Sequence, residues 1–222
     1  MKYLLIFILS LSVIACSVTR PHEKLAQDQA AQANLVAVAK PHFDASFISP
    51  TTVFSHYKKI IINDIDLSQT VIIQPSSKNA FDAPWVLSDD DKQFYQARFS
   101  ESAKRNLLDS GLFTLAANGD ANSDTLVLKT KITDIAPHAS KDDFKSRPNL
   151  MDVYSEGFGR MTIVFELYDA TTNQLIMIAT DEHDLGTMWE LNNKVQNNLR
   201  IRLAFDFWLS KLKRELNAAA KF

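Results

Sequence analysis

The feature that most constrains this chain is its first 16 residues, an apolar run that ends at a single cysteine. Residues 4–14 are almost wholly apolar, and Lys2 precedes them. A membrane-spanning helix needs about 20 apolar residues, so this run is too short and instead has the length of a signal-peptide apolar region. Because Cys16 is the only cysteine, no disulfide forms within the chain, and the fold must be stable without cross-links.

The residues around that cysteine, Val13-Ile14-Ala15-Cys16, resemble the lipobox of bacterial lipoproteins. The resemblance implies cleavage after Ala15 and lipid on Cys16, which anchors the chain to a membrane. Ser17 stands where an Asp retains such proteins in the inner membrane, which implies the periplasmic face of the outer membrane. The alternative is an ordinary secretory signal with a chance cysteine at the cleavage point.

Composition excludes several classes of function. The net charge is −2, so the basic surface that binds nucleic acid is missing, and we expect no nucleic-acid partner. Only five glycines are present, which disfavours the glycine-rich loops that hold phosphates. We therefore expect no cofactor.

The chain divides into three expected parts. Residues 1–15 are the signal peptide, and residues 16–50 are expected to form a lipid-anchored flexible tether that is rich in Ala and Gln. Their apolar residues form no sustained stripe that would hold a helix in place. Residues 51–218 then form a single domain.

Two long helices are predicted in that domain. The first covers residues 88–111, where Ser88 and Asp91 have capping-box spacing and Gly111 suits the position after the last turn. Its predicted apolar stripe, with a residue at every fourth position, consists of Tyr95, Phe99, Ala103 and Leu107. The second covers about residues 191–218. Its predicted apolar stripe consists of Val195, Leu199, Leu203, Phe207, Trp208, Leu212 and Leu216.

Strands surround the first helix. The order is strands, helix, strands, helix, which predicts an α+β fold: a mostly antiparallel sheet of about five strands with two long helices packed on one face. The last two strands are joined by a short turn and form an antiparallel hairpin. The strand segments are residues 57–65, 70–74, 113–116, 125–135, 161–169 and 175–183.

Three local patterns occur along the chain: a Trp shortly before a helix that begins Leu-Ser plus acids, a strand ending in Thr-Asp-Ile, and a Tyr-Asp-Ala-Thr turn. Together they resemble a domain of unknown function found in many Gram-negative lipoproteins. Relatives often carry Gly at that turn, where this chain has Asn173, which also adopts left-handed backbone angles. The resemblance covers about residues 54–212 and implies a fold and an envelope location, without catalytic residues. The matching positions are Trp85, Leu87–Asp91, Thr133–Ile135 and Tyr168–Thr172.

One cluster offers metal-ligand chemistry. Asp181-Glu182-His183-Asp184 is the densest group of potential ligands, and in a strand Asp181 and His183 share a face. Metal sites need three or four converging ligands, so we expect a charged strand end that discourages edge pairing instead. No HExxH or GxSxG motif is present.

The long polar segment 136–158 is the best candidate for an interaction surface, because loops of that length are often functional. Our leading hypothesis is a non-enzymatic binding or accessory module for an unidentified envelope partner. The alternatives are an accessory subunit of an envelope transport or cell-wall synthesis machine, and a metal-dependent hydrolase that uses residues 181–184. Aromatic residues among the candidates have a second explanation, which is capping of the core. The candidate interaction residues are Trp85, Arg147, Asn149, Asp152 and Tyr154.

Overall fold

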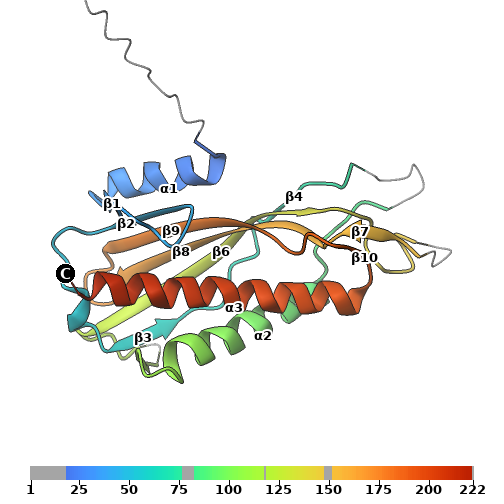
Figure 1. Ribbon diagram of the computed structural model, residues 1–222. Helices are drawn as coiled ribbons and strands as arrows, with labels where there is room; N and C mark the ends of the chain where they lie inside the picture. Colours follow the sequence, from blue (N-terminus) through green and yellow to red (C-terminus); the bar gives the residue numbers. More distant parts are fainter. Residues whose placement is uncertain (1–18, 77–82, 118, 148–151, 222) are drawn as a thin grey trace, which may run out of the picture.

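The computed structural model describes residues 19–76, 83–117, 119–147 and 152–221. Ala15, Cys16 and Asn149 lie outside these ranges. Helices α2 and α3 cover one face of a large sheet, and helix α1 covers part of the other face (Figure 1). None of the helices within the described ranges is long and apolar enough to cross a membrane.

The main sheet contains eight strands within the described residues, in the order β1-β2-β9-β8-β6-β3-β5, with β4 also paired to β6. Most pairs are antiparallel, but β3 and β4 run parallel to β6, and β5 runs parallel to β3. The α+β class is confirmed; the sheet is larger than the five strands expected. The strands are β1 (Val36–Ala37), β2 (Ala45–Ile48), β3 (Lys59–Ile62), β4 (Val71–Ile72), β5 (Thr114–Leu115), β6 (Thr125–Pro137), β8 (Gly159–Asp169) and β9 (Leu175–Asp184). A separate two-stranded sheet pairs β7 (Tyr154–Glu156) with β10 (Trp189–Leu191).

The predicted hairpin forms the centre of the main sheet. Strands β8 and β9 pair antiparallel, and Asn173 in their turn has a φ of 53°, in the left-handed region expected for it. On β6, Leu126, Leu128 and Ile132 are buried while Lys129 is exposed, so apolar and charged side chains point to opposite faces of the strand.

Helix α2 (Asp89–Ala103) begins and ends much as predicted. Ser88 accepts a hydrogen bond from the backbone N–H of Asp91, and the Asp91 carboxylate accepts one from the N–H of Ser88. A π-helical turn, Lys104–Leu108, continues the helix, and Gly111 follows with a φ of 74°. The buried stripe is the predicted one: Tyr95, Phe99, Ala103 and Leu107.

Helix α3 (Lys194–Ala219) covers nearly the predicted residues, but its buried stripe differs. Trp208, Leu212 and Leu216 are buried as expected, whereas Val195 is 78% exposed and Phe207 is 40% exposed. Leu199 and Leu203 are exposed as well. At about 100° per residue, Leu203 and Leu212, which are nine positions apart, point to opposite sides of the helix. The predicted stripe therefore combined residues from two opposite faces, of which only one packs on the sheet. Ile201, Ala204, Phe205 and Leu209 also face the sheet.

The expected flexible tether over residues 16–50 is wrong for residues 19–50, which are folded. Helix α1 (Pro21–Gln32) buries Ala26 and Ala30, which pack with Val164 and Ile178 of the sheet. Strand β2 then pairs antiparallel with β9. A narrow face of small residues was enough for this packing, because alanines let a helix lie close to a strand. The sequence pattern did not show so narrow a face.

A buried ion pair connects α3 to β9. Asp181 is 2% exposed, and its carboxylate accepts hydrogen bonds from Lys211 Nζ at 2.6 and 2.7 Å and from the Trp208 indole N–H at 3.0 Å. The backbone N–H of Asp44 donates to the same carboxylate at 2.9 Å. Asp181 therefore joins the helix, the sheet and the segment that precedes β2.

We predict that Lys211→Met destabilises the protein far more than removal of a neighbouring charge. The substitution leaves the Asp181 carboxylate buried without its cation, and loss of one partner of a buried pair costs about 3–5 kcal/mol of unfolding free energy. Urea unfolding at neutral pH measures this cost. Lys213→Met, which removes the same charge from a half-buried position, is the matched control and should cost less than about 0.5 kcal/mol. Equal losses in the two variants would contradict the assignment.

Candidate functional site

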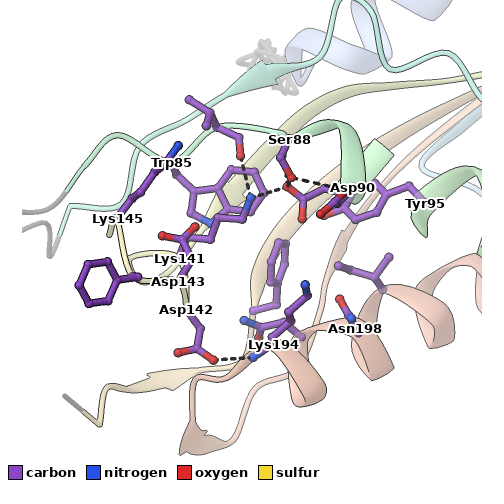
Figure 2. Close-up of a pocket in the computed structure, with 16 residues that line it drawn as sticks. Trp85, Ser88, Asp90, Tyr95, Lys141, Asp142, Asp143, Lys145, Lys194 and Asn198 are labelled. Atoms are coloured by element: carbon purple, nitrogen blue, oxygen red, sulfur yellow. Dashed lines mark hydrogen bonds and ion pairs between the residues drawn. The ribbon is translucent and has the colours of Figure 1, made fainter. Parts of the chain in front are cut away.

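A cleft of about 420 Å³ opens at the end of the molecule where α2 and α3 both begin (Figure 2). Three segments line it: residues 85–95 at the start of α2, the loop 141–145, and residues 194–201 at the start of α3. Phe158, just before β8, completes the lining. The two helices lie side by side and run in the same direction, which brings their N-terminal ends together.

Aromatic and aliphatic side chains line the apolar part of the cleft. Trp85 is 5% exposed, and its ring meets that of Phe158 edge to face at a centroid distance of 6.1 Å. The side chain of Gln74 holds the Trp85 backbone through two hydrogen bonds of 2.7 and 2.9 Å. Tyr95 and Ile201, both buried, extend this surface. Trp85 thus packs in the core while lining the cleft.

One lysine connects the loop to the start of α2. Lys141 Nζ lies 5.0 Å from the centre of the Trp85 ring, donates to the Val86 carbonyl at 3.1 Å, and forms an ion pair with Asp91. Asp91 also accepts a 2.6 Å hydrogen bond from the Ser88 hydroxyl. Burial raises the pKa of a carboxyl group, but at Asp91 the hydrogen bonds from Lys141 and Ser88 outweigh burial, and its pKa lies below the usual value.

A second carboxylate occupies the start of α3. Asp142 Oδ2 accepts a 2.9 Å hydrogen bond from the backbone N–H of Lys194, and Asp142 Oδ1 lies 3.3 Å from Arg147 Nη1. Arg147 is buried and donates to the carbonyls of Asn192 at 2.8 Å and Ser140 at 2.6 Å. Arg147 therefore fixes the loop 138–147 against the start of α3 from inside the protein.

These contacts define the chemistry that the cleft offers. A helix N-terminus attracts anions, but Asp91 and Asp142 already occupy both N-termini. The rim carries both signs of charge, from Asp90, Lys145 and others, beside Phe144, which is 71% exposed. An uncharged or zwitterionic ligand with an apolar part therefore suits this cleft better than an anion does.

The five residues predicted as an interaction surface do not lie together. Trp85 lines the cleft, and Arg147 is buried behind it. Tyr154, 61% exposed, lines a different groove. Asp152 is exposed just before β7, and Asn149 lies outside the described residues.

The cluster Asp181–Asp184 does not converge on a metal site. Asp181 is engaged by Lys211 and Trp208, and the ring of His183 stacks on Phe207 at a centroid distance of 4.4 Å. Glu182 is on the opposite face of β9 and contacts arginines there. The hydrolase hypothesis therefore loses the site on which it rested.

Another group of potential ligands was missed because its members were assigned to the tether. Ligand atoms of His22, Glu23 and Asp44 all lie within 4.8 Å of one another. Arg20 Nη1 lies 3.1 Å from the same Asp44 oxygen that His22 contacts at 3.2 Å. The guanidinium thus already supplies a cation to this group, which we interpret as an anchor for the start of α1.

Most residues of the cleft carry no signal in the sequence that identifies them. Lys141, Phe144, Asn197 and Asn198 line it without any recognisable motif. The sequence signals next to the cleft are the N-cap residues of the two helices. Ser88 was identified as an N-cap. Asn193, whose side chain accepts a 2.9 Å hydrogen bond from the Gln196 N–H, was not. The two helix N-termini lie close together because α2 packs on α3, and no local sequence pattern specifies that packing.

We predict that Asp91→Asn lowers the unfolding free energy at pH 7 by about 1 kcal/mol, the typical worth of a helix cap. Because the folded pKa lies below the unfolded value of about 3.9, ionised Asp91 stabilises the folded state above that pH. This contribution is lost as the pH falls through the folded pKa. The difference between wild type and variant should therefore shrink at low pH in urea-unfolding titrations.

Asp89→Asn is the matched control for this prediction. Asp89 lies in the same helical turn and is paired only with Lys92, with 89% of its side chain exposed, so the substitution should leave stability nearly unchanged. A wild-type advantage over Asp91→Asn that stays constant from neutral to acid pH would show that the charge of Asp91 has no such role.

Comparisons with solved structures give only distant similarities. The PelC dodecamer protein from Paraburkholderia phytofirmans is 9% identical, with a TM-score of 0.39, over 75% of this chain and 96% of that one. A minor lipoprotein from Acinetobacter baumannii is 13% identical, with a TM-score of 0.36, over 73% and 94%. A DUF330 protein from Xanthomonas campestris is 9% identical, with a TM-score of 0.40, over 81% and 90%. Similarities this weak transfer no function.

No curated protein matches the chain. A family model does match it, over residues 25–212, which is most of its length. That match includes most of α1, the cleft and most of α3, and it agrees with the resemblance drawn from Trp85 and the hairpin turn. The chain therefore belongs to the family described as "Protein of unknown function (DUF3313)".

Proposed function

We propose that this protein is a lipoprotein of the Gram-negative envelope, anchored through Cys16 to the periplasmic face of the outer membrane. Its domain acts as a non-enzymatic binding module that receives part of an envelope partner in the cleft between α2 and α3. The observation that carries the binding role is the cleft itself, with an apolar surface and two helix N-termini already occupied by Asp91 and Asp142.

The lipobox-like residues Val13 to Cys16 support the anchor. Lipid on a single cysteine leaves no thiol for other chemistry, and more than one acyl chain makes membrane attachment stable. Ser17 in place of Asp favours the outer membrane by the sorting pattern noted above.

The pairing of charged groups supports binding rather than catalysis. General acid–base chemistry needs a titratable group held within reach of substrate. Among the described lining residues of the cleft there is no histidine or cysteine, and the Ser88 hydroxyl donates to Asp91. Lys141 and Asp142 hold the loop in place, so their charges serve the shape of the cleft.

The anchor predicts that Cys16→Ser abolishes lipid attachment. Cells fed radiolabelled palmitate should label the wild-type protein and leave the variant unlabelled, and only the wild type should fractionate with outer membranes. Ser17→Ala is the matched control, because it changes the neighbouring residue and leaves the thiol. Equal labelling of the Cys16→Ser variant, or none in the wild type, would refute the anchor.

The binding role predicts a partner contact that depends on the cleft. A photo-crosslinking amino acid at Phe144, on the rim, should give a discrete adduct in cells, whereas the same residue at Leu115 should not. Leu115 is 63% exposed on β5, at the edge of the sheet away from α1. Asn198→Trp fills the cleft and should abolish the adduct while the thermal unfolding midpoint is retained.

A Phe144 adduct that persists in a folded Asn198→Trp variant would contradict the assignment of the binding site to the cleft. Adducts of the same size from both Phe144 and Leu115 would also contradict it, because they would reflect nonspecific collisions.

A further inference from the structure

A second exposed feature lies on another part of the surface and is not used by the proposed binding role. Tyr154 on β7 and Trp189 on β10 are 61% and 73% exposed, and Met188 beside Trp189 is 74% exposed. The pairing register makes Tyr154 and Trp189 diagonal neighbours across the two strands. With Ile73, 45% exposed, these two aromatic residues line a groove of about 500 Å³. We call these four residues the aromatic patch.

The start of the folded chain lies next to this groove. Arg160, which lines the groove, places its Nε 3.2 Å from Glu182 Oε2. Arg20, the residue before α1, places its Nη1 3.8 Å from Glu182 Oε1. A single carboxylate therefore contacts both the side of the groove and the point where the chain enters the fold.

The chain between that point and the lipid is short. Cys16 precedes Arg20 by four residues, which span at most about 14 Å at full extension. Because residues 19–50 are folded rather than a spacer, a lipid on Cys16 holds the region around Arg20 and Glu182 close to the bilayer. The aromatic patch then lies within reach of the same surface.

We propose that the aromatic patch rests in the headgroup region of the membrane that holds the lipid anchor, and so fixes the orientation of the domain. This inference rests on the lipid at Cys16 in the proposed function. Trp and Tyr are the residues enriched at membrane–water interfaces, where one end of the ring is apolar and the other is hydrated. Ile73, which lines the same groove, adds apolar area, and the exposed Met188 precedes Trp189 in the chain.

The charges near the aromatic patch indicate whether its contact with a membrane depends on anionic lipid. Arg20 and Arg160 both face Glu182, and Glu156 and Asp184 lie beside the groove. The positive charges are therefore balanced by carboxylates, and anionic lipid gives no electrostatic advantage. Contact through the aromatic side chains should be the same on zwitterionic and anionic bilayers.

Tryptophan fluorescence tests this arrangement directly. Of the three tryptophans, Trp85 and Trp208 are buried and Trp189 is exposed. The lipidated full-length mature protein is incorporated into phosphatidylcholine vesicles with brominated acyl chains, and its attachment is verified by flotation. We expect the Trp189 emission, defined as the difference between wild type and Trp189→Phe, to shift to shorter wavelength and to be quenched by bromine. Replacing a third of the lipid with phosphatidylglycerol should not change the quenching.

The matched control moves the reporter to another surface. Trp189→Phe combined with Leu115→Trp places an indole at the exposed position on β5, at the opposite edge of the sheet from α1. Its emission should be insensitive to brominated lipid and should be quenched by iodide in the buffer.

The outcomes separate this inference from the anchor. Protein that floats with vesicles while Trp189 stays unquenched refutes membrane contact by the patch and leaves the anchor standing. Equal quenching of the indoles at positions 189 and 115 refutes a fixed orientation. Wild-type protein that carries no lipid and does not float refutes the proposed anchor, and this inference with it.

Discussion

The packing of α2 beside α3 on one face of the sheet is the constraint on which the rest of the structure depends. Phe205 of α3 is fully buried and meets Tyr95 and Phe99 of α2 at centroid distances of 6.3 and 5.9 Å. These contacts hold the two helices parallel, so both N-termini lie at one end of the molecule. Two positive helix ends close together repel each other unless negative charge is placed between them.

The acidic residues at that end supply this negative charge, and they also shape the cleft. Asp91 caps α2 and pairs with Lys141, while Asp142 binds the start of α3 and contacts Arg147. Each carboxylate thus connects a helix end to the loop 138–147. The loop is therefore ordered by the same charges that the helix packing demands, and its residues 141–145 form one wall of the cleft. The proposed binding surface therefore follows from the electrostatics of helix packing.

The sequence was most informative where structure is decided locally. The capping box at Ser88, the helix end at Gly111 and the left-handed turn at Asn173 each depend on a few neighbouring residues, and all three were predicted correctly. The buried stripe of α2 was predicted because its period is regular. Where burial depends on a partner element, the sequence failed: residues 19–50 form a helix and a sheet strand, and Val195 lies outside the core.

The candidate site was less predictable than the fold for the same reason. Trp85 was selected for its residue type and does line the cleft, but Arg147, chosen as a surface residue, is buried. The residues next to an arginine in a polar segment do not indicate whether carbonyl groups from other segments will surround its side chain in the folded protein. Asp181 was interpreted as part of a charged, exposed strand end, but it is buried in an ion pair with Lys211. Lys211 lies 30 positions away on a helix, so the local sequence around Asp181 does not indicate this partner.

The folding of residues 19–50 also determines how the proposed anchor and the proposed binding cleft are placed relative to each other. Helix α1 lies on one face of the sheet, whereas α2 and α3, which form the cleft, lie on the other (Figure 1). With a flexible tether, the orientation of the cleft to the membrane would be random. Because α1 is packed on the sheet and Arg20 is held by Asp44 and Glu182, the proposed lipid at Cys16 would attach on the side of the sheet away from the cleft. Under the proposed function, the cleft would remain open to a partner while the protein stays on the membrane, so that anchoring and binding would not compete for one surface.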